Sequence, residues 1–344
     1  MSDAQYQAAL ALFGQGRHPE GAQLLAQAAQ GGHVPSMSLL GGQLLAGRGV
    51  RPDPVAGIRL IMVAADRGGA YACAMAAALA ASGVDGRPDW PRALRYLRRS
   101  AALGYGPAQA QLQLLMGDKR EVDLKAWRRA PPTQALSDEP RVLTVKSLLA
   151  PAVCHWLIAR ARERLRPAQV YDDATGGPTA NNTRRNSAAE FALADMDLVL
   201  LAVRERLAAA TGLPAEHMQG SQVLHYKVGE RFTPHFDFLD PTVEGLARDI
   251  AARGQRVATV LVYLNDGLEG GETEFPLLNI RHRGALGDAL VFFNVDADGE
   301  PDRRTLHAGL APTAGEKWLL SQWVRDRVPP GMGDPRLAAA LKGR

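Results

Sequence analysis

The sequence predicts a multidomain α + β protein, with N-terminal α-helical hairpin repeats followed by a double-stranded β-helix (a jelly roll) with flanking helices. Two observations predict this class. Small residues recur every 36 positions in the first third of the chain, and short runs of β-branched and aromatic residues dominate after residue 221. A chain of 344 residues is long enough for two domains, each with its own core.

Residues 1–117 contain three imperfect copies of one helical unit. Two sets of small residues keep the same spacing: Ala29, Ala65 and Ala101, and Gly32, Gly68 and Gly104. A fixed period with alanine-rich segments and glycine punctuation predicts stacked helical hairpins, and agreement between several columns argues against chance alanine bias. The pattern resembles the Sel1-like repeat, a relative of the tetratricopeptide repeat, which implies a surface for a protein partner.

The periodicity stops after residue 117. Residues 118–140 are polar and punctuated by proline, which predicts a linker. Residues 141–328 then form the second predicted domain, and residues 329–344 a C-terminal tail. This domain should begin with two amphipathic helices, at 147–166 and 196–210. Antiparallel strands should follow, and they are expected at 222–228, 231–238, 256–264, 289–294 and 317–325.

Composition indicates an ordinary globular protein of slightly basic net charge, +4. The densest basic run, between Arg87 and Arg99, has little aromatic interleaving and predicts a solvated helix face rather than a nucleic-acid site. No apolar run approaches the roughly 20 residues that span a bilayer, so no membrane partner is expected. The two cysteines, Cys73 and Cys154, lie in different regions, and we expect a reducing cytoplasm.

A possible metal site lies in the sequence His235-Phe236-Asp237. In a strand, residues i and i+2 point to the same face, so an imidazole and a carboxylate would lie side by side. His307, from a distant strand, would complete a face of two histidines and one carboxylate. That set with open positions is typical of non-haem Fe(II) oxygenases. Zinc is the competing metal, but no His-Glu-x-x-His helix accompanies these residues.

A candidate anion site follows ten residues after His307. Lys317 begins a strand-like stretch, Lys317-Trp318, after Gly315-Glu316. A buried lysine beside a metal needs an anion, and a dicarboxylate cosubstrate would supply one. The remaining histidines lack metal-ligand spacing and are expected in the core or on the surface. His225 is the nearest rival among them as a metal ligand.

These motifs resemble, in the same order, those of the prolyl 4-hydroxylase branch of the 2-oxoglutarate-dependent oxygenases. The resemblance runs from about Arg141 to Arg327 and rests on Tyr226-x-x-Gly229, His235-x-Asp237, Gly287-Asp288, Leu306-His307 and Gly315-Glu316-Lys317-Trp318. Arg185-Asn186-Ser187 resembles the family's Arg-Thr-Ser segment, with asparagine in place of threonine.

The resemblance implies an enzyme that uses O2 and 2-oxoglutarate and releases succinate and CO2 as it hydroxylates a C–H bond. Iron(II) would be held by His235, Asp237 and His307. The far carboxylate of 2-oxoglutarate would meet Lys317, with Tyr226 and Thr259 as hydrogen-bond donors, and ascorbate is a possible further cofactor. A protein or peptide substrate, first of all a peptidyl proline, is expected. Two alternatives stay open: a non-prolyl or small-molecule substrate, and an inactive scaffold that binds partners.

Overall fold

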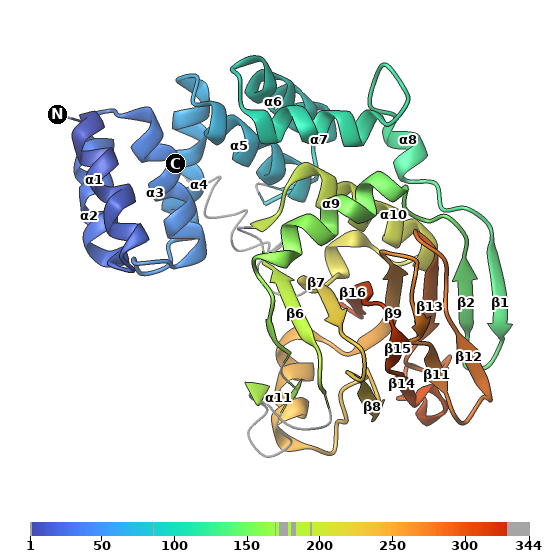
Figure 1. Ribbon diagram of the computed structural model, residues 1–344. Helices are drawn as coiled ribbons and strands as arrows, with labels where there is room; N and C mark the ends of the chain where they lie inside the picture. Colours follow the sequence, from blue (N-terminus) through green and yellow to red (C-terminus); the bar gives the residue numbers. More distant parts are fainter. Residues whose placement is uncertain are drawn as a thin grey trace. The chain divides into compact units, whose positions relative to one another are not determined.

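The computed structural model describes residues 2–84, 86–168, 170–171, 178–179, 184–192 and 195–328. The chain forms two compact units (Figure 1). The first contains the described residues up to Asp123 together with residues 195–202. The second contains the described residues of 124–192 and 203–328. The predicted tail, 329–344, lies outside the described residues.

The first unit is a series of antiparallel helices, as the repeat predicts. Neighbouring helices pack in pairs along the chain. They are α1 (Ser2–Gly14), α2 (His18–Gln30), α3 (Val34–Ala46), α4 (Pro54–Asp66), α5 (Ala70–Ser82), α6 (Trp90–Ala102) and α7 (Gly106–Met116).

The repeated residues have defined roles at the helix ends. Gly32, Gly68 and Gly104 adopt φ angles of 81°, 85° and 85°, a left-handed conformation that glycine reaches without a Cβ clash. Asp53 and Asp89, also 36 positions apart, each cap a helix by accepting a backbone N–H at 2.9 Å. The constant interval of 36 residues therefore reflects one repeated way of ending and starting a helix.

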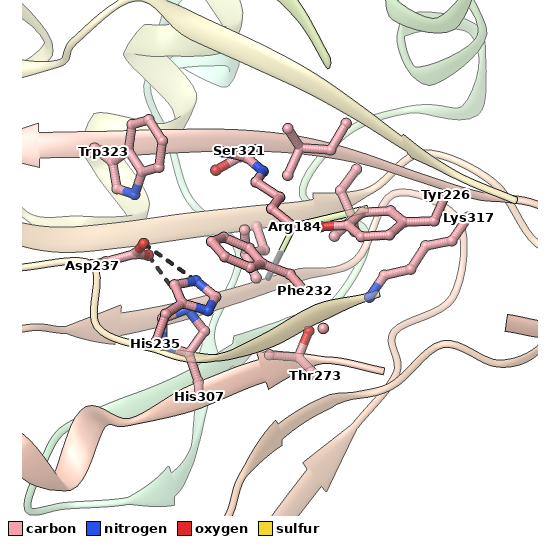
Figure 2. A pocket seen from close by; sticks show the side chains of 14 residues that line it. Arg184, Tyr226, Phe232, His235, Asp237, Thr273, His307, Lys317, Ser321 and Trp323 are labelled. Carbon is pink, nitrogen blue, oxygen red and sulfur yellow. Dashed lines mark ion pairs between the residues drawn. The ribbon is translucent and has the colours of Figure 1, made fainter. Parts of the chain in front are cut away.

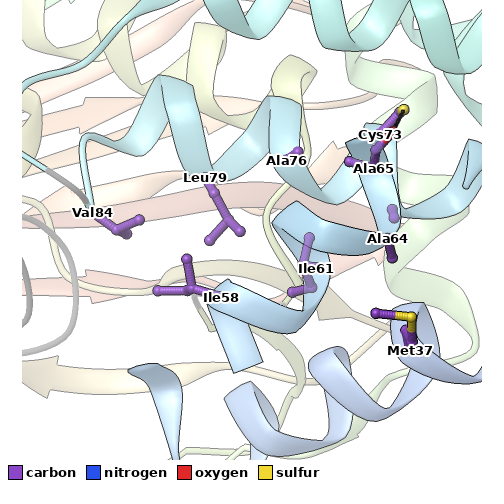
Figure 3. Close-up of a cluster of buried hydrophobic side chains, with 10 residues drawn as sticks. Met37, Ile58, Ile61, Ala64, Ala65, Cys73, Ala76, Leu79 and Val84 are labelled. Atoms are coloured by element: carbon purple, nitrogen blue, oxygen red, sulfur yellow. Dashed lines mark hydrogen bonds between the residues drawn. The ribbon is translucent and has the colours of Figure 1, made fainter. Parts of the chain in front are cut away.

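A hydrophobic cluster fills the space between α3, α4 and α5 (Figure 3). Small side chains dominate where the helices approach most closely. Gly41 and Gly57 face each other, and a Cβ on Gly57 would lie 2.8 Å from the carbonyl oxygen of Gly41. The buried members of the cluster are Met37, Ile58, Ile61, Ala64, Ala65, Ala72, Cys73, Ala76, Leu79 and Val84.

Residues 118–140 are not a linker throughout, which corrects the prediction. A short helix, α8 (Leu124–Trp127), is followed by β1 (Thr133–Ser137), which pairs antiparallel with β2 (Val142–Val145). The hairpin turns at Ser137-Asp138-Glu139-Pro140. Because β1 is an edge strand with mostly exposed side chains, its sequence is polar and lacks the apolar signal of a buried strand.

The second unit is the predicted double-stranded β-helix. Its larger sheet has the order β1-β2-β13-β9-β16-β7-β6-β3, and its smaller sheet the order β12-β11-β14-β8. The further strands of the larger sheet are β3 (Arg166–Pro167), β6 (Ser187–Phe191), β7 (Ser221–Tyr226), β9 (Arg256–Tyr263), β13 (Ala289–Phe293) and β16 (Lys317–Arg325). Those of the smaller sheet are β8 (Phe232–His235), β11 (Thr273–Phe275), β12 (Ile280–His282) and β14 (His307–Gly309). Two separate antiparallel pairs, β4 (Val170–Tyr171) with β5 (Pro178–Thr179) and β10 (Glu269–Gly270) with β15 (Pro312–Ala314), complete the pairing.

The two sheets enclose one apolar core. Phe275 from the smaller sheet meets Phe292 from the larger sheet edge to face, with ring centroids 5.1 Å apart. The buried residues of this core are Val142, Leu224, Tyr226, Leu261, Tyr263, Phe275, Leu290, Phe292 and Leu319. Inward and outward side chains alternate along β7 and β16, so Tyr226 and Lys317, which are register partners, share the inner face.

Three helices accompany the sheets. Helix α9 (Pro151–Arg162) packs against β6 and β7, and it is shorter than the predicted 147–166 because Ser147 adopts a φ of 48° and donates its N–H to Asp288. Helix α10 spans Leu198–Thr211 and α11 spans Glu244–Arg253. None of the helices in the described part of the chain is long and apolar enough to cross a membrane.

Candidate functional site

Two strands of the smaller sheet bring the predicted histidines together. His307 begins β14 and is the register partner of His235, the last residue of β8. Their ring centroids lie 4.3 Å apart. Asp237 lies two residues beyond the end of β8, in a bend, so strand alternation does not place it as the sequence argument assumed. The bend brings its carboxylate to the same side as both imidazoles (Figure 2).

The three side chains have the composition and spacing of a metal site. Asp237 Oδ1 lies 3.8 Å from His235 Nε2, and Asp237 Oδ2 lies 3.6 Å from His307 Nε2. One ligand atom from each residue lies within 4.8 Å of the others. Two imidazole nitrogens and one carboxylate oxygen could therefore coordinate a single ion through one face.

Backbone carbonyls orient both imidazoles for coordination. His235 Nδ1 lies 2.8 Å from the carbonyl oxygen of Thr233, and His307 Nδ1 lies 3.0 Å from that of Thr305. A carbonyl only accepts, so each Nδ1 carries the hydrogen and each Nε2 keeps its lone pair. Burial, and then the neighbouring His307, lower the pKa of His235 to about 3, which keeps that imidazole in the neutral, ligating form.

Asp237 is ionised and held from two sides. Burial by itself would raise the pKa of Asp237, but His307, His235 and a hydrogen bond from Thr259 together lower it below its usual value. Thr259 Oγ1 donates to Asp237 Oδ2 at 2.7 Å. Arg256 Nη1 donates to the Asp237 carbonyl oxygen at 3.4 Å. The hydroxyl of Thr259 is therefore engaged with Asp237, whereas the sequence analysis expected it to meet a cosubstrate carboxylate.

Lys317 presents a buried ammonium group to the same cavity. Its side chain is 1% exposed, and no described residue forms a hydrogen bond or ion pair with Nζ. Burial lowers the pKa of Lys317 to about 7, against the opposing attraction of Glu272. Nζ lies 5.3 Å from the ring centroid of Tyr226. A buried cation without a partner is costly, and an anionic ligand would satisfy it.

One cavity connects the three possible metal ligands with Lys317 (Figure 2). Tyr226 lines it, and burial raises the pKa of that phenol to about 12, so its hydroxyl stays protonated and can donate. Thr273, which is 2% exposed, lines it as well. Thr259, by contrast, is absent from the lining residues.

Arg184, Phe232 and Trp323 are among the residues of the cavity wall that sequence reasoning did not assign to the site. Phe232 stacks on His235 with ring centroids 3.5 Å apart. The guanidinium carbon of Arg184 lies 4.9 Å from the ring centroid of Phe232. Arg185, which the family resemblance singled out, is exposed, whereas Arg184 is buried. Arg184 precedes β6 and forms an isolated antiparallel bridge with Phe232, so no strand alternation in the sequence pointed to it.

His225, the rival ligand, is on the outer face of the larger sheet. Its ring stacks on Trp318 at 4.1 Å, and its Nε2 lies 3.1 Å from Glu316 Oε2. Its register partner, Trp318, neighbours Lys317 but faces the opposite way. His225 therefore does not join the group of His235, Asp237 and His307.

Comparison with known proteins agrees with this geometry. Residues 221–325 match the model of the 2OG-Fe(II) oxygenase superfamily. Prolyl 4-hydroxylase 1 of Arabidopsis thaliana is 32% identical over 209 residues, which cover 57% of this chain and 72% of that protein. Probable prolyl 4-hydroxylase 10 of the same plant is 34% identical over 214 residues, which cover 56% and 71%.

Solved structures resemble different parts of the chain. A viral collagen prolyl hydroxylase from Paramecium bursaria Chlorella virus-1, in complex with 2OG, is 25% identical, with a TM-score of 0.41, and the match covers 54% of this chain and 95% of that one. A Sel1 repeat protein from Oxalobacter formigenes is 20% identical, with a TM-score of 0.32, and the match covers 37% and 61%. On its similarity in sequence to curated prolyl 4-hydroxylases, the chain belongs to the prolyl 4-hydroxylase family of 2OG-Fe(II) oxygenases.

Proposed function

We propose that the protein hydroxylates peptidyl proline, with Fe(II) as its metal and 2-oxoglutarate and O2 as cosubstrates. One observation carries this proposal. A two-histidine, one-carboxylate group and a buried lysine without a partner line the same cavity. A structural ion pair would not leave Lys317 without an acceptor, and an inactive scaffold would have no need of either group.

The ligand set fits Fe(II) better than a structural metal. Two imidazoles held through Nδ1 and one ionised carboxylate would leave further positions of the metal open. We assign His235, Asp237 and His307 as the three ligands. With both groups bound, iron and 2-oxoglutarate supply oxidative decarboxylation to succinate and CO2, coupled to insertion of oxygen into a C–H bond.

Lys317 and Tyr226 would bind the far carboxylate of 2-oxoglutarate. The Lys317 ammonium offers a charge-assisted hydrogen bond, and the Tyr226 phenol, protonated at neutral pH, offers a second donor. The anion in turn favours the charged form of Lys317, whose pKa burial has lowered. The apolar walls of the cavity, including Leu261 and Leu319, exclude water from this contact.

The substrate assignment rests on the relatives, which are named as prolyl 4-hydroxylases. The cavity wall suits a peptide. Trp323 has a buried indole N–H without a partner among the described residues, and Arg184 carries a guanidinium beside the ring that stacks on His235. Both groups donate only, as recognition of backbone carbonyls requires.

Mass spectrometry of proline-containing peptides tests this function. We expect incubation with Fe(II), 2-oxoglutarate and O2 to add one oxygen to a proline, with one succinate formed per hydroxylation. Oxygen on another residue, or on a small molecule only, would favour the non-prolyl alternative. Absence of both metal binding and 2-oxoglutarate turnover would favour an inactive scaffold.

Three further assignments belong to the same proposal. Ascorbate is a reductant of the iron, and turnover with and without it tests this. The helices α1–α7 bind a protein partner or the substrate protein, as the Sel1-like pattern implies. The protein works in the cytoplasm, where its two buried cysteines, Cys73 and Cys154, stay reduced.

A further inference from the structure

Asp237 receives a chain of two hydrogen bonds from the larger sheet. Thr259, in the middle of β9, donates through Oγ1 to Asp237 Oδ2 at 2.7 Å. Asn294, which follows β13, donates through Nδ2 to Thr259 Oγ1 at 3.1 Å. Thr259 and Asn294 are both 0% exposed, so bulk water does not compete for these bonds. We call these two residues the Asn294–Thr259 relay.

The direction of the relay follows from the donors and acceptors. An ionised carboxylate only accepts, so the single hydroxyl proton of Thr259 lies on its bond to Asp237. The atom of Asn294 that approaches Thr259 Oγ1 must then be the amide nitrogen, because two acceptors would repel each other. Asn294 therefore fixes the rotation of the Thr259 hydroxyl, and the hydroxyl fixes the rotation of the carboxylate.

The backbone of Asp237 is held independently of the relay. Arg256 Nη1 reaches the Asp237 carbonyl oxygen at 3.4 Å, Arg256 Nε donates to Gln219 Oε1 at 2.8 Å, and its guanidinium lies 4.0 Å from the ring centroid of Trp323. Loss of the relay would thus free the carboxylate to rotate while leaving the main chain in place. Mutation of the relay can therefore test the orientation of the carboxylate separately from the position of the Asp237 backbone.

We propose that the Asn294–Thr259 relay keeps Asp237 a one-oxygen ligand, an inference that rests on the proposed function. Oδ2 is engaged with Thr259, which leaves Oδ1, the oxygen on the side of His235, as the donor to a metal. A chelating α-keto acid and O2 together need three open positions of a six-coordinate metal, which is what two imidazoles and a one-oxygen carboxylate would leave. A carboxylate that bound through both oxygens would take one of these three. Thr259 and Asn294 are therefore positioning residues for cosubstrate binding.

The experiment compares Thr259→Val with Thr259→Ser and with the wild type, all loaded with Co(II) as a spectroscopic substitute. Valine keeps the shape of threonine without the hydroxyl, and serine restores the hydroxyl. The matched control is Thr144→Val, at a buried threonine of β2 whose hydroxyl donates to the backbone carbonyl of Gln134 and to no other described residue. Anaerobic titration measures the affinity for 2-oxoglutarate, and the visible spectrum of Co(II) reports its coordination.

We expect Thr259→Val to keep its Co(II), to show an altered Co(II) spectrum, and to bind 2-oxoglutarate about 10- to 100-fold more weakly, the usual effect of losing a contact behind a metal ligand. Thr259→Ser and Thr144→Val should resemble the wild type. A Thr259→Val protein with the wild-type spectrum and affinity would overturn the relay.

A second variant keeps the test decisive if Thr259→Val fails to fold. Asn294→Leu removes the donor that orients the hydroxyl, and should shift the Co(II) spectrum in the same direction by a smaller amount. An unchanged spectrum in Asn294→Leu contradicts the relay. Failure of the proposed function would look different, because the wild type itself would then bind neither Co(II) at the triad nor 2-oxoglutarate.

Discussion

At the scale of single residues, Lys317 has the most costly environment of the cavity. Its ammonium is buried without an acceptor, and burial lowers its pKa to about 7. The unfolded chain would titrate near the ordinary value of about 10.4. Folding therefore opposes protonation of Lys317, a cost that the proposed binding of an anion would offset.

Lys317→Met should make the protein without cosubstrate more stable. In the wild type, burying the charged form of Lys317 lowers the free energy of unfolding. This cost is absent above pH of about 10, grows as the pH falls, and is complete below the folded pKa of about 7. At pH 6.5 we expect a gain of about 2–4 kcal/mol in the free energy of unfolding. Denaturant unfolding measures it, with the exposed Lys227→Met as the control. Equal destabilisation at all pH values would contradict the assignment.

The same substitution should weaken the binding of 2-oxoglutarate. In the proposed function the cosubstrate binds the charged lysine, so wild-type affinity should be highest below pH of about 7 and should fall as the pH rises. Removing a charge-assisted bond costs about 1.5–3 kcal/mol, or roughly a tenfold to hundredfold loss in affinity. Titration calorimetry between pH 6.5 and 9 tests this. A pH-independent affinity would mean that another cation holds the anion.

Loss of any one of the three ligands should abolish iron binding. His235→Ala, Asp237→Ala and His307→Ala each remove one of the three proposed ligand atoms. The fold should survive, because the sheets enclose a separate apolar core. Metal analysis after reconstitution gives the result, and His225→Ala is the matched control because His225 faces away from the site. Iron at wild-type stoichiometry in all three variants would refute the assignment.

At the scale of elements, the strands that frame the site were largely predictable from sequence. β9, β13 and β16 begin and end within one residue of their predicted bounds because they are central strands, rich in apolar residues and buried along nearly their whole length. Asp237 was predicted as a ligand for the wrong reason, since it lies in a bend after β8. Chain pattern also could not show that Thr259 turns its hydroxyl to Asp237, because that contact depends on the distance between two sheets.

Residues that carry no local signal were the ones missed. Arg184 and Trp323 reach the cavity from β-structure far apart in the sequence, and only the closed fold brings them to His235. The edge strand β1 was missed for a different reason: half of its pairing partners are absent, so its side chains stay polar. Hydrophobic periodicity reports that one face of an element is buried among apolar side chains. The side chains of an edge strand are largely exposed, and those of a cavity wall are partly polar, so neither gives that pattern.

Helix α11, which follows the loop after Asp237, is tied to the larger sheet by one buried ion pair. Arg325 at the end of β16 is 0% exposed and donates to Asp249 Oδ2 at 2.6 Å and to the carbonyl oxygen of Gly254. Asp249→Ala would leave the guanidinium buried without its carboxylate. We expect a loss of about 3 kcal/mol in the free energy of unfolding, measured with denaturant, and a smaller loss for Asp249→Asn, which keeps an acceptor. Equal stability of Asp249→Ala and wild type would show that α11 is held by other contacts.

At the scale of the whole molecule, the repeats and the oxygenase fold are not separated cleanly along the chain. Residues 195–202 belong to the same compact unit as the repeats. The backbone N–H of Leu198 donates to Gln111 Oε1 at 3.1 Å, and Asp195 Oδ1 forms an ion pair with Arg48 Nη2 at 3.5 Å. The start of α10, with Leu198, Val199 and Leu200 all buried, therefore depends on residues from the N-terminal third.

A protein that begins at Leu124 should therefore be less stable and more prone to aggregate than the full chain. Thermal unfolding and size-exclusion chromatography measure this. A finer version is Gln111→Leu in the full chain, which leaves the buried N–H of Leu198 without its acceptor and should cost about 1–3 kcal/mol. If the shortened protein unfolds at the temperature of the full chain, residues 195–202 do not need the repeats.

The central claim is that one cavity activates O2 with iron and 2-oxoglutarate and hydroxylates a peptidyl proline. Turnover of a proline-containing peptide under isotopically heavy dioxygen tests it most directly, with mass spectrometry of both products. We predict one heavy oxygen atom in succinate and one in hydroxyproline, and neither product with the His307→Ala protein. Succinate without the label, or an oxidised peptide whose oxygen comes from water, would contradict the claim.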